Sequence, residues 1–161
     1  MIQANVGTSF TAYIQTEDNR IDTSVPVAQI RLLFAFTNIM DKSVQYAYPV
    51  LFNIYNRYTQ AGFTYSATPN VFGGSVNLTP SGFYYYEVYE VSWAGSSVVL
   101  DTGTAPTTPT DVLTPAADTK GVVKGLVTKG LLNLSDKAGT GQVQYTQHTP
   151  ASETNYIYYG Q

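Results

Sequence analysis

The stretch LTPSGFYYYEVYE, residues Leu78–Glu90, is the most informative local pattern in this chain of 161 residues. Its Pro-Ser-Gly sequence, Pro80 to Gly82, is typical of a turn. The segment that follows holds four tyrosines and a valine, residue types that favour a β-strand. The order Leu-x-Pro-x-Gly-x-Tyr-x-Tyr therefore predicts a tight turn that leads directly into a strand.

This spacing resembles the corner at which an immunoglobulin-like sandwich enters its strand F, where a tyrosine hydroxyl hydrogen-bonds to the backbone just upstream. Tyr86 occupies the position at which antibody domains keep their second disulfide cysteine, and the chain has no cysteine. The resemblance implies that Tyr84 makes the hydrogen bond and that the ring of Tyr86 replaces the disulfide. The structural corner then consists of Leu78, Pro80, Gly82, Tyr84 and Tyr86.

Alternation of apolar and polar residues with period two dominates the chain, and helical periodicity is almost absent. The clearest case is Ala28–Thr37, which predicts a core strand. Leu33 is an apolar exception on the opposite face. The residues expected to face the core are Ile30, Leu32, Phe34 and Phe36.

The other strands are predicted from shorter patterns. Pro49 interrupts the aromatic segment Val44–Tyr58 and removes a backbone donor, so we expect a bulge or a sheet edge there. Gly73 and Gly74 indicate a turn, and Gly121–Leu134 indicates either a hairpin or one bulged strand. Further strands are expected at Ser9–Gln15, at Gln60–Ser66, and as a pair formed by Ser75–Leu78 and Phe83–Ser92.

The expected fold class is all-β, an antiparallel immunoglobulin-like β-sandwich with an extended C-terminal arm. We expect the sandwich to span residues 1–101. Residues 102–120 are rich in threonine and proline, which favours an extended linker or surface-crossing segment. Residues 121–161 are expected to form short strands and a docking arm.

Composition limits the classes of partner. Charged residues make up 12% of the chain, about half of the roughly 25% usual in globular domains, and aromatic residues make up 14%. Protein interfaces share this depletion of charge and enrichment in tyrosine. The few basic residues are scattered and the net charge is -3, so we expect no nucleic-acid partner. Without an apolar stretch or a signal-like N-terminus, we expect neither a membrane span nor secretion.

No constellation of catalytic residues is evident, and we expect no enzyme, no cofactor and no metal site. The single histidine, His148, has no nucleophile elbow to accompany it. Glu87 and Glu90 point to opposite faces of one predicted strand, whereas glycoside hydrolysis needs two carboxylates that flank a cleft. The acidic group Glu17, Asp18 and Asp22 lacks the glycine and terminal glutamate of a calcium loop.

The chain as a whole looks like the auxiliary proteins of tailed bacteriophages, being free of cysteine, poor in charge, and built as a sandwich with an arm. This resemblance implies a virion protein that decorates or cements the capsid, with the major capsid protein or other virion proteins as partners and a homo-oligomeric state in the assembly. The arm residues expected to bind the partner are Tyr145, Tyr156, Ile157, Tyr158 and Tyr159.

Three alternatives stay open at this point. The protein could belong to the neck or tail of the particle rather than to the head. The outward tyrosines could stack on a surface glycan, which would make the chain a carbohydrate-binding module. A small hydrolase is the alternative that the residues support least.

Overall fold

The computed structural model describes residues 1–93, 98, 108 and 121–136, and these form two β-sheets. The described residues contain no α-helix, so the expected all-β class is confirmed. The elements are β1 (Ile2–Asn5), β2 (Phe10–Ile14), η1 (Glu17–Asn19), η2 (Val27–Gln29), β3 (Ile30–Asn38), β4 (Val44–Ala47), β5 (Leu51–Ile54), β6 (Thr59–Tyr65), β7 (Ser75–Val76), β8 (Gly82–Ser92) and β9 (Val122–Ser135).

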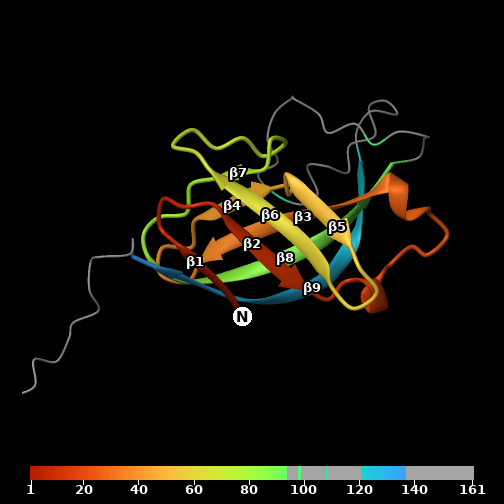
Figure 1. The fold of residues 1–161 in the computed structure, drawn as a ribbon, viewed down its shortest axis with the longest axis horizontal. Helices are drawn as coiled ribbons and strands as arrows, with labels where there is room; N and C mark the ends of the chain where they lie inside the picture. Colours follow the sequence, from red (N-terminus) through yellow and green to blue (C-terminus); the bar gives the residue numbers. More distant parts are fainter. Residues whose placement is uncertain (94–97, 99–107, 109–120, 137–161) are drawn as a thin grey trace, which may run out of the picture.

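The larger sheet has the strand order β1-β9-β8-β3-β4, and the smaller sheet has the order β2-β6-β5 with β7 paired to β6. Figure 1 shows the smaller sheet lying across the larger one. Most neighbouring strands are antiparallel, as expected. Two pairs, β1 with β9 and β6 with β7, are parallel, which the expectation of a purely antiparallel fold did not include.

Strand β3 lies at the centre of the packing. Its residues Leu32, Phe34 and Phe36 are buried in the core between the sheets, and Ile30 is also buried, so the predicted inward face is confirmed. Phe63 from the smaller sheet packs edge-on against the rings of both phenylalanines, at centroid distances of 4.9 and 5.3 Å. Burying one such side chain stabilises the fold by about 1.5–3 kcal/mol.

The opposite face of β3 is buried as well. Leu33 and Ala35 belong to a second cluster that contains Tyr46, Tyr48 and Trp93. A strand covered on both faces loses the simple alternation of apolar and polar residues. Burial on both faces therefore explains why Leu33 departs from the pattern.

Pro49 marks the point at which the chain passes from one sheet to the other. Strand β4 belongs to the larger sheet and β5 to the smaller one. The backbone N–H groups on either side of the proline find partners outside a regular ladder, from Tyr48 to the Val71 carbonyl and from Val50 to the Gly62 carbonyl. The expected disruption is thus a change of sheet, which places β5 at an edge.

Two sequence-based expectations are wrong, one about the partner of β7 and one about the place of residues 122–135. Strand β7 pairs with β6 and not with β8, because β8 is already flanked by β3 and β9. Residues 122–135 do not belong to an arm, since they form one long strand between β8 and β1. This strand has two register shifts opposite β8 and is therefore the bulged strand that was one of the two expectations for Gly121–Leu134.

The predicted corner hydrogen bond is present at the start of β8. The hydroxyl of Tyr84 donates to the backbone carbonyl of Pro80 at 2.7 Å, and the side chain is only 2% exposed. Leu78 is buried in the same core. Burial raises the pKa of the Tyr84 hydroxyl, which the amide of Asn38 partly opposes.

Replacement of Tyr84 by phenylalanine should lower the free energy of unfolding by about 1–3 kcal/mol, because the Pro80 carbonyl loses its buried partner. Urea denaturation of Tyr84→Phe measures the effect. Tyr85→Phe is the matched control, since this neighbouring side chain is exposed and its change should cost less than about 0.5 kcal/mol. Equal midpoints for Tyr84→Phe and the control would contradict a stabilising corner bond.

Tyr86 packs over a glycine of the neighbouring strand. It pairs with Gly130 of β9, and a Cβ atom added to that glycine would lie 2.7 Å from the Tyr86 hydroxyl oxygen and 2.8 Å from Cζ. Because Gly130 has no side chain, the ring of Tyr86 can occupy the space above it. Tyr86 stands at the position where antibody domains keep a disulfide cysteine, and its ring packs on Gly130 of the neighbouring strand.

Gly130→Ala should destabilise the protein by about 1–3 kcal/mol, since the methyl group overpacks a buried contact and forces the Tyr86 ring to move. Thermal unfolding measures the change. Gly73→Ala serves as the control, because its nearest neighbour would be Asn70 at an ordinary 3.4 Å. If the two alanine variants were equally stable, the contact between Tyr86 and Gly130 would not restrict this position.

Candidate binding surfaces

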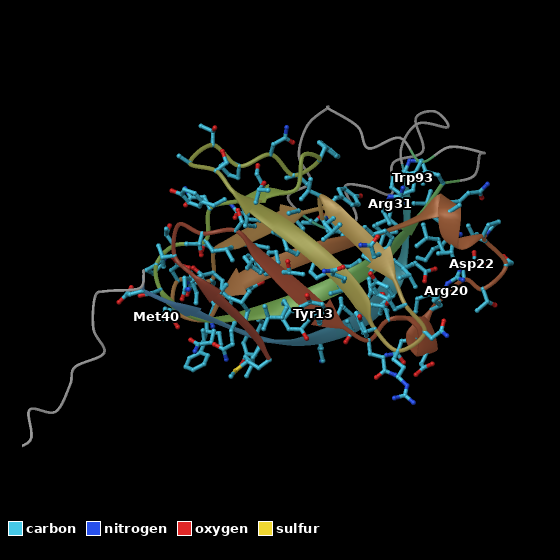
Figure 2. All side chains as sticks on the ribbon, in the orientation of Figure 1. Tyr13, Arg20, Asp22, Arg31, Met40 and Trp93 are labelled. Carbon is cyan, nitrogen blue, oxygen red and sulfur yellow. The ribbon has the colours of Figure 1, made fainter. Side chains whose placement is uncertain are left out.

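The long connection after β2 is held by a buried carboxylate. Glu90 of β8 is 1% exposed and accepts hydrogen bonds from the backbone N–H groups of Ile21 and Asp22, at 3.1 and 3.0 Å. Arg20 donates to the carbonyls of Asp22 and Val25. Figure 2 shows Arg20 and Asp22 at the end of the molecule opposite Met40. The carboxylate thus supports a loop and faces no open cleft.

The cavity beside Glu90 is too small for a substrate. Its volume is about 10 Å³, the space of roughly one water molecule. Arg20, Glu90, Thr16 and Val127 are among the residues that line it. The arrangement therefore positions the loop but offers no room for chemistry on a ligand.

Asp22, another acidic residue singled out from the sequence, also binds within the protein. Asp22 accepts hydrogen bonds from Ser24 and forms an ion pair with Lys124 at 3.2 Å. The hydrogen bonds from Ser24, followed by the interaction with Lys124, lower the pKa of Asp22. Among the described residues no group of three or more His, Cys, Asp or Glu side chains comes together.

Glu87 and Glu90 lie on opposite faces of β8, as expected. The Glu87 carboxylate accepts a hydrogen bond from the hydroxyl of Tyr89, two residues further along the same face, at 2.8 Å. Burial, followed by the interaction with Glu87, raises the pKa of Tyr89 from 10.0 to about 12. The folded state therefore favours the protonated hydroxyl.

The free energy of unfolding should fall between pH 10 and 12 and should fall less in Tyr89→Phe. A pKa raised in the folded state contributes stability below the unfolded value of 10.0, and this contribution is lost as the pH rises toward 12. Burial also raises the pKa of Tyr84 and Tyr86, so the free energy of unfolding of the variant should still fall with pH, but by less. Urea unfolding at pH 8 to 12 tests this, and parallel profiles for the two proteins would contradict it.

An exposed apolar surface lies on the outer face of the larger sheet. Tyr85 and Phe83 of β8 point away from the core and are 52% and 51% exposed. Strand register places Leu131 of β9 directly beside Tyr85. On the other side of Tyr85 lies Thr37 of β3, and Val44 of β4 is the next residue beyond Thr37. We call the four exposed side chains, Val44, Phe83, Tyr85 and Leu131, the docking face.

A second surface lies on the smaller sheet and its hairpin. The ring of Tyr58 contacts the rings of Tyr13 and Tyr55, at centroid distances of 5.7 and 4.8 Å. All three side chains are exposed, Tyr13 by 62%. Figure 2 shows Tyr13 near the middle of the molecule in the view that has the smaller sheet in front. We call these three side chains the tyrosine strip.

An open groove of about 690 Å³ begins at the tyrosine strip. It runs along the edge of β5 that has no neighbouring strand, and Asn53, Tyr55 and Arg31 line it. The guanidinium carbon of Arg31 lies 5.6 Å from the ring centroid of Phe52. Burial lowers the pKa of Arg31.

The structure brings the predicted corner residues together, whereas the predicted arm residues, Tyr145, Tyr156, Ile157, Tyr158 and Tyr159, lie outside the described residues, as does His148. Sequence reasoning did not single out the tyrosine strip. The signal available to it was the pair Tyr55 and Tyr58 at the end of the aromatic segment Val44–Tyr58. Its third member, Tyr13, comes from a strand more than 40 positions earlier.

Comparison with known proteins identifies no relative of the chain: no protein-family model matches it, and no curated protein or solved structure shows significant similarity to it. No helix in the described part of the chain is long and apolar enough to cross a membrane.

Proposed function

We propose that the two sheets form an immunoglobulin-like sandwich. In that architecture strands C, F and G share one sheet, joined by C′ in variable-type domains, while B, E and D share the other. The order β9-β8-β3-β4 corresponds to G-F-C-C′, and β2-β6-β5 corresponds to B-E-D. The hydrogen bond of Tyr84 at the start of β8 supports the assignment of this strand as F.

The chain departs from antibody domains at three points. It has no disulfide, and its tryptophan, Trp93, follows β8 instead of lying on the strand that corresponds to C. Strand β1 joins β9 in the larger sheet, whereas strand A of constant-type domains lies in the sheet of B, E and D. These differences leave the proposed architecture in place but separate the chain from the antibody type.

For the biological role, we propose a non-enzymatic structural protein of a bacteriophage virion, which decorates or cements the capsid by binding a neighbouring virion protein. The observation that carries the proposal is the docking face, where Phe83 and Tyr85 are half exposed, Leu131 lies beside Tyr85, and Val44 lies beyond Thr37 on the other side. Aromatic residues are enriched in interface cores and charged residues are depleted there. The low charge of the whole chain and its resemblance to auxiliary phage proteins support the assignment to a virion.

The C-terminal arm is part of the same proposal. Strand β9 ends at Ser135, two residues beyond Asn133, which pairs with Phe83 of the docking face. An arm that follows Asp136 would therefore start at the border of this face. We propose that Tyr145 and the four residues Tyr156 to Tyr159 bind the same neighbouring subunit, because large aromatic side chains each remove roughly 150–250 Å² from water.

The double variant Phe83→Ser, Tyr85→Ser should fold normally and fail to enter particles. Both side chains are exposed, so their loss should change stability little, whereas the interface loses its central apolar contacts. Mass spectrometry of particles assembled in the presence of the other virion proteins measures incorporation. Truncation after Asp136 keeps β9 complete and should also reduce incorporation.

Leu51→Ser with Tyr65→Ser is the matched control, because both side chains are exposed on strands of the smaller sheet. This control should enter particles at the level of the unmodified protein. Normal incorporation of the docking-face variant would refute the role of that face. Normal incorporation of the truncated protein would refute the role of the arm while leaving the docking face unaffected.

A further inference from the structure

The tyrosine strip is an exposed aromatic surface that the core does not require. Tyr13 alternates with the buried residues Ala12 and Ile14, so its ring points away from the packed interior. Tyr55 and Tyr58 flank the turn between β5 and β6, where a backbone hydrogen bond from Tyr55 to Tyr58 closes the hairpin. Ring contacts between the three tyrosines hold a continuous surface in place.

A row of uncharged polar groups lies next to the strip. Strand register aligns Tyr13, Gln60 and Asn53 across β2, β6 and β5. Asn53 Nδ2 donates to Gln60 Oε1 at 3.2 Å, and Gln60 Nε2 donates to the Tyr13 hydroxyl at 3.4 Å. The chain of bonds fixes the two amides, and within the described part of the protein Asn53 Oδ1 accepts no hydrogen bond. An ordered acceptor therefore faces solvent beside an aromatic surface.

The groove adds a positive charge that no carboxylate of residues 1–93 or 121–136 pairs with. Arg31 is the charged residue among those that line the groove, and Nη1 donates to the carbonyl of Ile30 at 2.7 Å. Within the described residues, Lys124 and Asp22 form an ion pair, and Arg31 forms none. A partly buried guanidinium on an aromatic ring is well placed to bind an anionic group from a ligand.

We propose that the tyrosine strip and the adjoining groove bind an acidic oligosaccharide. The strip stacks against the apolar face of a pyranose ring, and the amides of Gln60 and Asn53 hydrogen-bond to its hydroxyl groups. Asn53 and Tyr55 border both the strip and the groove, so the saccharide passes from one to the other. A carboxylate on a neighbouring sugar reaches Arg31.

A sugar fits this surface better than a protein does. The strip combines tyrosine rings in edge-on and tilted contact with a row of two amides and one hydroxyl, and a ligand with an apolar face and many hydroxyl groups can use both. An amide pair also lies beside the docking face, where Asn133 Nδ2 donates to Gln3 Oε1 at 3.2 Å next to Phe83, but in the described residues that pair is not bonded to a tyrosine hydroxyl. Because the two surfaces lie on different sheets, the saccharide site does not depend on the proposed virion role.

An array of immobilised neutral, uronate-containing and sialylated oligosaccharides tests the proposal on the full chain. Saturable binding to acidic members is expected. Calorimetry then compares the strongest-binding oligosaccharide with its carboxyl-reduced counterpart, which differs only in charge. Tyr58→Ala should weaken both by about tenfold, since stacking is lost for either sugar. Arg31→Gln should weaken the acidic form alone, to the level of the reduced one.

Tyr85→Ala on the docking face is the control and should leave binding unchanged. If Arg31→Gln fails to fold, Arg31→Met keeps an unbranched side chain over Phe52 and removes the same charge. The proposal is overturned by the absence of binding on the array, by an equal loss in Tyr58→Ala and Tyr85→Ala, or by equal affinities for the acidic and reduced sugars. Unchanged incorporation of Tyr58→Ala into particles would separate this site from the docking face.

Discussion

Nine consecutive residue pairs join β3 to β8, from Ile30 opposite Ser92 to Asn38 opposite Tyr84. Successive side chains of a strand point to opposite faces, so a slip of one residue would exchange the two faces of β8. In the observed register Tyr84, Tyr86 and Val88 enter the core, and Phe83 and Tyr85 remain outside. The burial of Tyr84 and Tyr86 and the exposure of the docking face depend on this register, while the pairing of β8 with β9 places Gly130 under the ring of Tyr86.

The two candidate surfaces lie on different sheets, and only the one on the larger sheet depends on the register of β3 and β8. The outward residues on the larger sheet form an apolar area, which suits contact with another protein. The smaller sheet carries the tyrosine strip and its row of amides, at a distance along the chain from β8 but fixed by the pairing of β2, β6 and β5. Because the chain has few charged side chains, both surfaces are built on aromatic residues. They differ in the side chains around the rings, which include aliphatic residues on the docking face and the amides bonded to Tyr13 at the tyrosine strip.

Local patterns in the sequence predicted the elements that depend on neighbouring residues. The inward face of β3 and the turn before β8 follow from alternation and from turn chemistry, which act over a few positions. The bond made by Tyr84 was expected from the resemblance of this turn to an immunoglobulin-like corner. The disruption at Pro49 was also predicted, because proline lacks a backbone donor in any context. The placement of β9 was not, since its lysine and glycine residues weaken the alternation and its partner β8 lies about 40 positions earlier.

By itself, the sequence determined that the chain forms β-structure, that a turn at Pro80 leads into the tyrosine-rich strand β8, and that cysteine chemistry plays no part. Only the tertiary structure decided that residues 122–135 complete the larger sheet and that Tyr13 meets Tyr58 on the smaller one. The physical reason is the range of the interactions. Backbone propensity and side-chain alternation act over a few residues. Strand order and the grouping of surface residues into one site depend on pairing between segments that are far apart in the sequence.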